Sequence, residues 1–333
     1  MFDTAGVLII IVLIALFGFL TTRAWKLKNG ILKWGGVIIA GVLTLMSTAM
    51  LVLALVGFYK LNERFDNPIV NTQVTGTAAQ IARGEQLAHI CTSCHTTDGQ
   101  LPLSGTNFIA EFPSPPMGTL YGPNLTPAGN IKNWTDGEVI RAIREGVHQN
   151  GRALLIMPSG NFRNMSDDDV QALVGYLRSQ PATGKASPTN DFNLLGALFL
   201  NLSDFRSAQQ PVGSVIAPIT ETPEHGKYMV DIFGCRDCHG DQLQGRVENG
   251  LPGPTPGPNL TLIVPQWTEE QFMTFFNTGE LPGGWTVPII TLPSGFSEPR
   301  MPWSTVRAAT TDEELKDIYA YLHSLPIVEG PAK

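Results

Sequence analysis

All four cysteines of this 333-residue chain lie in two copies of one five-residue pattern. Residues 91–95 (CTSCH) and 235–239 (CRDCH) both follow Cys-x-x-Cys-His. Each His is followed by a Met-Pro pair, Met157-Pro158 in the first half and Met301-Pro302 in the second, and the separation is the same in both halves. Two motifs with the same spacing to the same dipeptide indicate an internal repeat, so we expect the chain to fold as two related units.

Further matched segments support the repeat. A Gly-Pro-Asn-Leu-Thr segment, a Trp-Thr pair and a longer stretch ending in Pro each occur once per half. The matched pairs are 122–126 with 257–261, 134–135 with 267–268, and 166–181 with 311–326. The spacing between landmarks differs in the middle of the two repeats, which indicates that loops of different length connect common elements.

The Cys-x-x-Cys-His pattern has a chemical reason. Two thiols add to the two vinyl groups of a haem, and the adjacent His offers its imidazole to the iron. A redox-active cysteine pair does not need that His, and a zinc site would bring together four thiolates from motifs in separate halves of the chain. We therefore predict two covalently attached haem c groups, held by Cys91, Cys94 and His95 and by Cys235, Cys238 and His239. Covalent attachment of this kind takes place outside the bacterial cytoplasm.

The sixth iron ligand in such sites is Met or His. Met157 and Met301 are the methionines that recur at one position in both repeats, which predicts His95/Met157 and His239/Met301 as the axial pairs. His148 is the rival ligand but has no counterpart in the second repeat. Among the other methionines, Met117 and Met165 also lack counterparts. His89, His225 and His323 are expected to be surface or internally paired residues.

A ligating His commonly donates its second ring N–H to an acceptor that fixes the ring orientation. The carbonyls of Pro123 and Pro258, in the repeated Gly-Pro-Asn-Leu segment, are candidates for this acceptor. A simple turn is the alternative interpretation of that segment. For Trp134, Trp267 and Arg152 we expect ordinary packing or surface roles rather than haem contacts.

The first sixty residues predict two membrane helices. No charged residue occurs in 4–22 or in 34–59, and about 20 apolar residues cross a bilayer. The connecting loop, 23–33, holds four cations and no acid, which places it in the cytoplasm and the rest of the chain outside. A cleaved signal peptide is the alternative for the first segment, although its start carries an acid rather than a base. No charged side chain or His lies within either span, so we interpret both as an anchor.

Charge distribution limits the partners. Residues 1–60 carry five Lys or Arg and one acid, so the remaining segment, 61–333, has a net charge of −11. An acidic globule is a poor ligand for a phosphate backbone, which excludes nucleic acid as a partner. The acidic surface instead favours salt-sensitive docking to a basic redox protein.

Local patterns predict helices and no convincing strand. Helices are expected just before each cysteine motif and from each of the two Trp-Thr pairs onwards. A further helix is expected over each long matched stretch, which begins with the capping pattern Ser166-x-x-Asp169 or Thr311-x-x-Glu314. The predicted fold is all-α, with domains at 76–181 and 220–328 and a linker at 182–219. Within the linker, the apolar segment 193–202 is too short to cross a membrane and is expected to pack between the domains, with a contact to the membrane surface as the alternative.

On these motifs, each repeat resembles a class I cytochrome c domain, and the whole chain is similar to membrane-anchored diheme cytochromes. These include subunits of haem–copper oxidases and of alcohol or gluconate dehydrogenases. The resemblance implies an electron carrier, not an enzyme, with His/Met ligation at both haems. It implies three kinds of partner: the lipid bilayer, a membrane oxidase, dehydrogenase or quinol-oxidising complex, and a soluble redox protein. It also implies that the protein lies in the cytoplasmic membrane with both haem domains on the periplasmic face. A diheme peroxidase, an electron-accepting dehydrogenase subunit and a redox or gas sensor are the alternatives.

Overall fold

The computed structural model describes residues 3–107, 117–203, 205–247, 255–291 and 297–330. The chain forms two compact units. The first comprises the described residues of Met1–Arg64, Pro113–Leu120 and Thr189–Arg206, and the second those of Phe65–Phe112, Tyr121–Pro188 and Ser207–Lys333. The fold is mostly helical, as predicted. Most of each predicted domain, 76–181 and 220–328, falls within the second unit.

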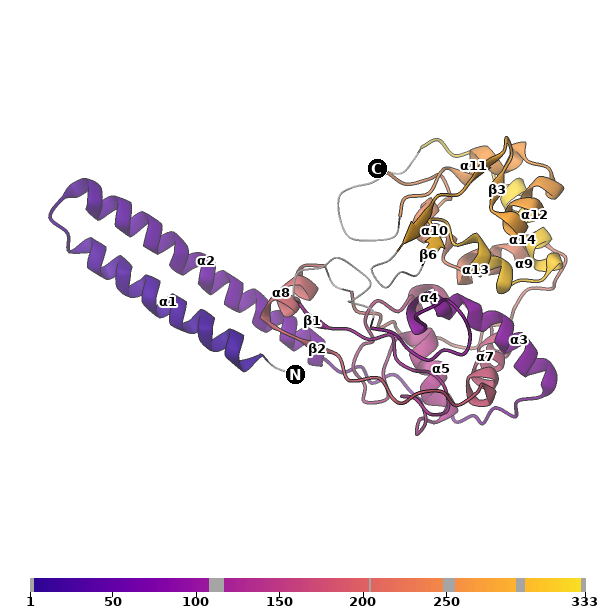
Figure 1. Cartoon of the computed structure of the whole chain (residues 1–333), viewed down its shortest axis with the longest axis horizontal. Coiled ribbons are helices and arrows are strands. Elements are labelled where there is room, and N and C mark those ends of the chain that lie inside the picture. Colours follow the sequence, from indigo (N-terminus) through magenta and orange to yellow (C-terminus); the bar gives the residue numbers. More distant parts are fainter. Residues whose placement is uncertain (1–2, 108–116, 204, 248–254, 292–296, 331–333) are drawn as a thin grey trace. The chain divides into compact units, whose positions relative to one another are not determined.

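The first unit is built on two long helices that lie side by side (Figure 1), α1 (Thr4–Trp25) and α2 (Gly30–Asn62). Asp3 and Asn29 cap their N-termini with side-chain oxygens. Both helices are long and apolar enough to cross a membrane, and very little of their apolar stretches is buried. The cationic loop expected at 23–33 is shorter, because its basic ends continue the helices and Lys26–Asn29 alone connect them.

The apolar part of the linker does not pack between the two repeats, contrary to expectation. It forms α8 (Leu194–Ser203), which packs on α2 within the first unit. The contact depends on a glycine: a Cβ at Gly57 would lie 1.9 Å from the carbonyl oxygen of Ala197. Spacing in the sequence could not reveal this partner. Beside α8, β1 (Gly118–Thr119) pairs antiparallel with β2 (Asp191–Phe192).

In the first repeat, a helical run leads into the cysteine motif as α3 (Ala78–Ala88), η1 (His89–Cys91) and α4 (Thr92–His95). Three more helices follow: α5 (Asp136–Glu145), α6 (Ser159–Phe162) and α7 (Asp167–Ser179). The predicted helix starts are present. A capping box begins α5, and the Ser166 hydroxyl accepts from the Asp169 N–H at the start of α7.

The second repeat has the same order with additions. Its helices are α9 (Pro223–Ile232), α10 (Cys235–His239), α11 (Leu260–Ile263), η3 (Val264–Gln266), α12 (Glu269–Thr278), α13 (Trp303–Ala308) and α14 (Asp312–Ser324). Two small antiparallel pairs precede α13: β3 (Glu280–Leu281) with β4 (Trp285–Thr286), and β5 (Ile289–Thr291) with β6 (Ser297–Pro299). Strands this short cannot show alternation, which is why the sequence predicted none.

In each repeat the helix before the cysteine motif packs on the last helix at a glycine. A Cβ at Gly84 of α3 would lie 1.9 Å from the Ala172 carbonyl oxygen of α7. In the second repeat, a Cβ at Gly226 of α9 would lie 1.9 Å from the Asp317 carbonyl oxygen of α14. The backbones therefore touch at both crossings. Around them the two repeats share one apolar core.

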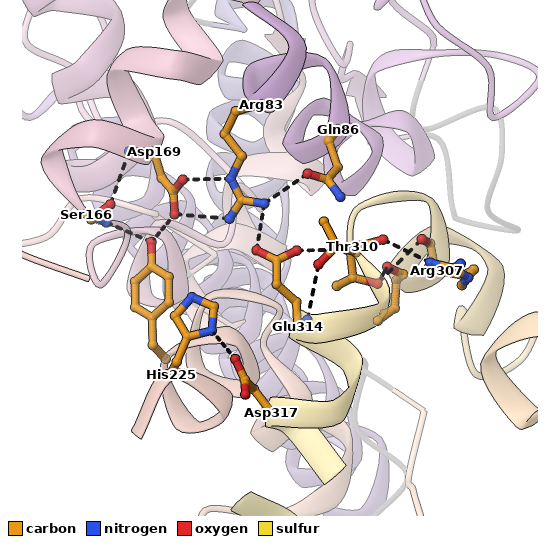
Figure 2. Close-up of polar contacts among 12 residues, drawn as sticks. Arg83, Gln86, Ser166, Asp169, His225, Arg307, Thr310, Glu314 and Asp317 are labelled. Carbon is orange, nitrogen blue, oxygen red and sulfur yellow. Dashed lines mark hydrogen bonds and ion pairs between the residues drawn. The ribbon is translucent and has the colours of Figure 1, made fainter. Parts of the chain in front are cut away.

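A polar cluster joins the repeats (Figure 2). Arg83 of α3 bonds Asp169 at 2.8 Å within its own repeat and Glu314 of the second repeat at 2.7 Å. In the other direction, the hydroxyl of Tyr228 in α9 donates to Asp169 and accepts from the Ser166 N–H. The two acids lie in the first turns of α7 and α14, where negative charge is favoured. The first turn of each last helix thus binds a residue of the other repeat.

Candidate functional site

The His of the first motif is buried and fixed by a backbone carbonyl. His95 ends α4, and its Nδ1 lies 2.8 Å from the carbonyl oxygen of Pro123. A carbonyl can only accept, so this contact requires the proton on Nδ1 and leaves the lone pair of Nε2 for a metal. Burial lowers the pKa of His95, which keeps the ring neutral and able to ligate.

The second motif has the same arrangement. His239 ends α10, is buried, and has its Nδ1 2.8 Å from the carbonyl oxygen of Pro258. Burial lowers the pKa of this His as well. The acceptors of these two hydrogen bonds are the carbonyls of Pro123 and Pro258, the candidates given by the sequence.

The Gly-Pro-Asn-Leu segment approaches the motif closely in both repeats. A Cβ at Gly122 would lie 1.7 Å from the Cys94 carbonyl oxygen, and one at Gly257 would lie 2.6 Å from the His239 ring. The following Asn anchors each segment from the other side. Asn124 donates to the Thr183 carbonyl at 2.7 Å, and Asn259 donates to the Val328 carbonyl at 2.8 Å. The segment is therefore a fixed support for the ring rather than a simple turn.

An apolar cavity lies beside His95. Besides Cys91 and His95, it is lined by Met157, Met165 and the aliphatic or aromatic side chains of Ile90, Leu125, Ile143, Phe162, Leu173 and Leu177. The chemistry of this lining suits a flat apolar group attached to Cys91 and ligated by His95, because a cysteine thiol, an imidazole and an apolar wall converge there.

The structure brings Met157 to the wall of this cavity. The residue before it, Ile156, has a φ of 64°, a left-handed conformation that is rare for a β-branched side chain. Such strain is stored where the surroundings fix a side-chain direction, and here it precedes the predicted ligand. Pro158 then caps α6.

Met301 occupies the matching place in the second repeat. The N–H two residues after it bonds its carbonyl at 2.7 Å, as at Met157, where the distance is 2.8 Å. Pro302 caps α13 as Pro158 caps α6, with closely similar backbone angles. The two Met-Pro turns therefore have one conformation.

Sequence reasoning missed the second methionine of the first cavity. Met165 is fully buried and lines the same space as Met157. The aligned position in the second repeat is Thr310, so Met165 does not recur in the repeat pattern. Its place just before the cap of α7, on the inner side of the repeat, could have indicated a core residue.

The cysteines are half-buried, and none forms a disulfide. Burial raises the pKa of Cys91 to about 12, that of Cys94 to about 11 and that of Cys235 to about 12. Thiols with these pKa values are protonated at neutral pH. Across the described ranges, no group of three or more His, Cys, Asp or Glu side chains is arranged to hold a metal ion.

The rival residues have other roles. His148 is not part of the cavity lining; its ring packs on Trp134, with ring centroids 4.7 Å apart. His225 is buried and its Nδ1 lies 2.8 Å from Asp317, an internally paired residue as expected. Trp267 packs on Phe275. Arg152 lies in the loop of His148, where its carbonyl accepts the His148 N–H.

Comparison with known proteins identifies the first repeat. Residues 81–181 match the family described as Cytochrome c. This segment includes Cys91, Cys94, His95 and Met157. A cytochrome c domain implies covalently bound haem c.

Three curated relatives are named as subunits of dehydrogenases. The chain is 29% identical over 231 residues to a nicotinate dehydrogenase subunit of Pseudomonas putida, covering 61% of this chain and 18% of that protein. It is 29% identical over 171 residues to the gluconate 2-dehydrogenase cytochrome c subunit of Pantoea cypripedii, covering 48% and 38%. It is 30% identical over 110 residues to the fructose dehydrogenase cytochrome subunit of Gluconobacter japonicus, covering 32% and 22%. The chain thus spans less than two fifths of each relative.

Proposed function

We propose that this protein is a membrane-anchored diheme c-type cytochrome that carries electrons on the outer face of the cytoplasmic membrane. The observation that carries the proposal is the duplicated contact between a motif His and a proline carbonyl, 2.8 Å in both repeats. A fixed Nδ1–H donor leaves Nε2 as a ligand in each repeat. The cytochrome c match of the first repeat supports the same role for its counterpart.

In this proposal the residues divide into three roles. Cys91 and Cys94, and Cys235 and Cys238, hold the haem covalently. His95 and Met157, and His239 and Met301, are the axial pairs. The carbonyls of Pro123 and Pro258 fix the imidazoles. Haem c, when bound, supplies a one-electron Fe(II)/Fe(III) couple.

If these His and Met side chains hold the iron from both sides, neither site would leave a position for a substrate. The close approaches at Gly122 and Gly257 and the apolar lining around His95 would hold these side chains in place around a bound haem. This favours a carrier over the alternative, a diheme peroxidase, which needs an open or releasable ligand position.

The partner we propose is a membrane-associated dehydrogenase complex. Two of the relatives are named as cytochrome subunits of gluconate and fructose dehydrogenases. An oxidase or a quinol-oxidising complex is the second candidate for the membrane partner. The anchor is α1 and α2, and the cations in and beside their connection, Arg23, Lys26, Lys28 and Lys33, favour a cytoplasmic position for it. Tethering then raises the effective concentration of the carrier near its partner.

The axial ligands are tested by absorption in the far red, where a sulfur-to-iron band reports Met ligation. We expect Met157→Ala and Met301→Ala each to remove part of this band, and the double variant to remove all of it. Met165→Leu is the matched control, since Met165 lines the same cavity and is more buried than Met157. Survival of the band in Met157→Ala with loss in Met165→Leu would reassign the ligand.

The carrier role is tested on native membranes. We expect the protein, solubilised in mild detergent, to comigrate with a dehydrogenase and to be reduced when that enzyme's substrate is added. Turnover of hydrogen peroxide by the purified protein would contradict the carrier role and favour the peroxidase.

A further inference from the structure

The linker helix α8 carries no charged residue, yet it lies outside both predicted membrane spans. Its inner side belongs to a small apolar cluster with α1 and α2. The cluster consists of Val7, Ala54, Phe58, Leu194 and Ala197, with Ile10, Leu51, Leu61 and Leu198 packed against it. The first unit is therefore a three-helix structure rather than a hairpin.

The contacts fix the level at which α8 meets the two long helices. Val7 is in the second turn of α1, and Gly57 and Phe58 are near the end of α2. All three lie inside the uncharged spans, Val7 near the start of 4–22 and the other two near the end of 34–59. These are the span ends on the side of the membrane where the rest of the chain is predicted to lie. At a rise of about 1.5 Å per residue, the α2 span is about 39 Å long, against about 30 Å of hydrocarbon, so its last turns reach the boundary of the acyl region.

Polar contacts hold both ends of α8 at this level. Asp3, which caps α1, also accepts from the Leu194 N–H at 2.9 Å. At the other end, Lys60 Nζ donates to the Asn201 carbonyl at 3.3 Å. Glu63 and Arg206 form an ion pair just beyond. The charged groups thus lie at the ends of α8, and none lies along it.

The outer face of α8 is apolar as well. Leu195, Phe199 and Leu202 are spaced by four and three residues and share one side of the helix. Leu195 is 38% exposed and Leu202 is 68% exposed. Many large apolar side chains of α1 and α2 are exposed as well. In a linker surrounded by water, a helix of ten uncharged residues with an exposed apolar side would be unfavourable.

We infer that α8 is an interfacial membrane helix, and that the occupant of its outer face is the acyl region of the outer leaflet. This inference rests on the proposed membrane anchor. With ten residues, α8 is about 15 Å long, too short to cross a bilayer but long enough to lie along its boundary. It would hold the segment between the two repeats at the membrane surface.

The test is the depth of a spin label at Leu202→Cys in the full, haem-loaded chain, reconstituted in phosphatidylcholine–phosphatidylglycerol nanodiscs. Oxygen concentrates among acyl chains and a nickel chelate stays in water, so their relative effects on label relaxation report depth. Val12→Cys, 63% exposed in the middle of α1, is the membrane reference, and Ile216→Cys, 87% exposed in the second unit, is the aqueous reference. Wild-type protein taken through the labelling measures any background from the native cysteines.

We expect oxygen to dominate at Leu202, at a level between the two references and nearer to Val12. If the nickel chelate has the larger effect on relaxation at Leu202 while oxygen has the larger effect at Val12, the inference is overturned and the anchor stands. Protection from both reagents would also overturn it, since a protein would then cover the face. Nickel dominance at Val12 would instead refute the anchor, and with it the inference.

A second variant pair tests whether the contact with α2 sets this depth. Gly57→Ala places a Cβ 1.9 Å from the Ala197 carbonyl oxygen, whereas a Cβ at Gly41 of the same helix meets nothing within 4 Å. We expect Gly57→Ala to shift the Leu202 label toward the aqueous reference and Gly41→Ala to leave it unchanged. An equal result for both variants would contradict a position held by α2.

Discussion

The two repeats have nearly the same supporting framework but differ in the segment that leads to the methionine. Both motif histidines bond a proline carbonyl at 2.8 Å, and both first helices touch the last helix at a glycine. The middle helices end at left-handed glycines, Gly146 and Gly279, yet the segment from Gly146 to Met157 is half as long as that from Gly279 to Met301. The framework is thus duplicated, whereas the segment that leads to the proposed methionine ligand differs between the repeats.

The difference shows in packing. In the first repeat the short segment ends in the left-handed Ile156, and Met157 joins a cavity with the fully buried Met165. In the second, the added length forms short strands whose side chains Trp285 and Ile289 are exposed. Few buried apolar contacts mean a lower free energy of local opening. The same His support thus occurs with two methionine segments that differ in length and in exposure.

The largest expected effect comes from the shared helix crossing. Gly84→Ala and Gly226→Ala each place a Cβ 1.9 Å from a backbone oxygen, so the helices must separate. We expect each variant to lower the free energy of unfolding by about 3 kcal/mol, measured by thermal unfolding followed by circular dichroism. Gly160→Ala, where the nearest atom is 4.0 Å away, is the control and should be neutral. A much smaller loss of unfolding free energy for one of the two variants would show that the two helix crossings are not equivalent.

The next effect concerns the cluster that joins the repeats. Arg83→Met leaves Asp169 and Glu314, with side chains 11% and 7% exposed, without their cation. We expect a loss of about 2 kcal/mol of unfolding free energy, discounted because Arg83 itself is 23% exposed.

The control for that variant is Lys227→Gln, which breaks an ion pair whose Lys is 55% exposed. Its expected cost is about 0.5 kcal/mol. Equal costs for the two variants in chemical denaturation would show that the cluster contributes no more than a surface pair.

A pH-dependent effect follows from Tyr228. Burial, followed by the charge of Asp169, raises the pKa of its hydroxyl. In the unfolded chain this group ionises near pH 10, so the stability it contributes is complete below about pH 10 and is lost as the pH rises further. We expect Tyr228→Phe to cost about 1 kcal/mol at neutral pH through lost hydrogen bonds and to flatten the alkaline decline in melting temperature. An unchanged alkaline slope would remove Tyr228 as its source; Tyr176, whose pKa is raised to about 12, would remain.

The smallest effect sharpens the difference between the ligand loops. In an imidazole titration of the oxidised protein followed by absorption, we expect Met301 to be displaced at a lower imidazole concentration than Met157. The Met157→Ala and Met301→Ala variants assign the two phases. Displacement of Met157 first would mean that the longer, more exposed segment does not loosen the ligand.

The sequence predicted the repeated framework well because each part has a local signature. Capping patterns located the starts of α5, α7, α12 and α14, and the Gly-Pro-Asn-Leu segments located the His supports. Tertiary choices had no such signature. The docking of α8 on α2 depends on a close approach at Gly57, the position of Met165 on burial, and the Arg83 cluster on residues from both repeats. Periodicity within one element cannot reveal which second element it will meet.

The central claim is that one chain holds two haem c groups, one per repeat, and the mass of the intact protein tests it most directly. We expect purified wild-type protein to have the mass of the chain plus two haems, and the Cys235→Ser/Cys238→Ser and Cys91→Ser/Cys94→Ser variants to have the mass of the chain plus one. A wild-type mass with a single haem, unchanged by the Cys235→Ser/Cys238→Ser substitutions, would contradict the account.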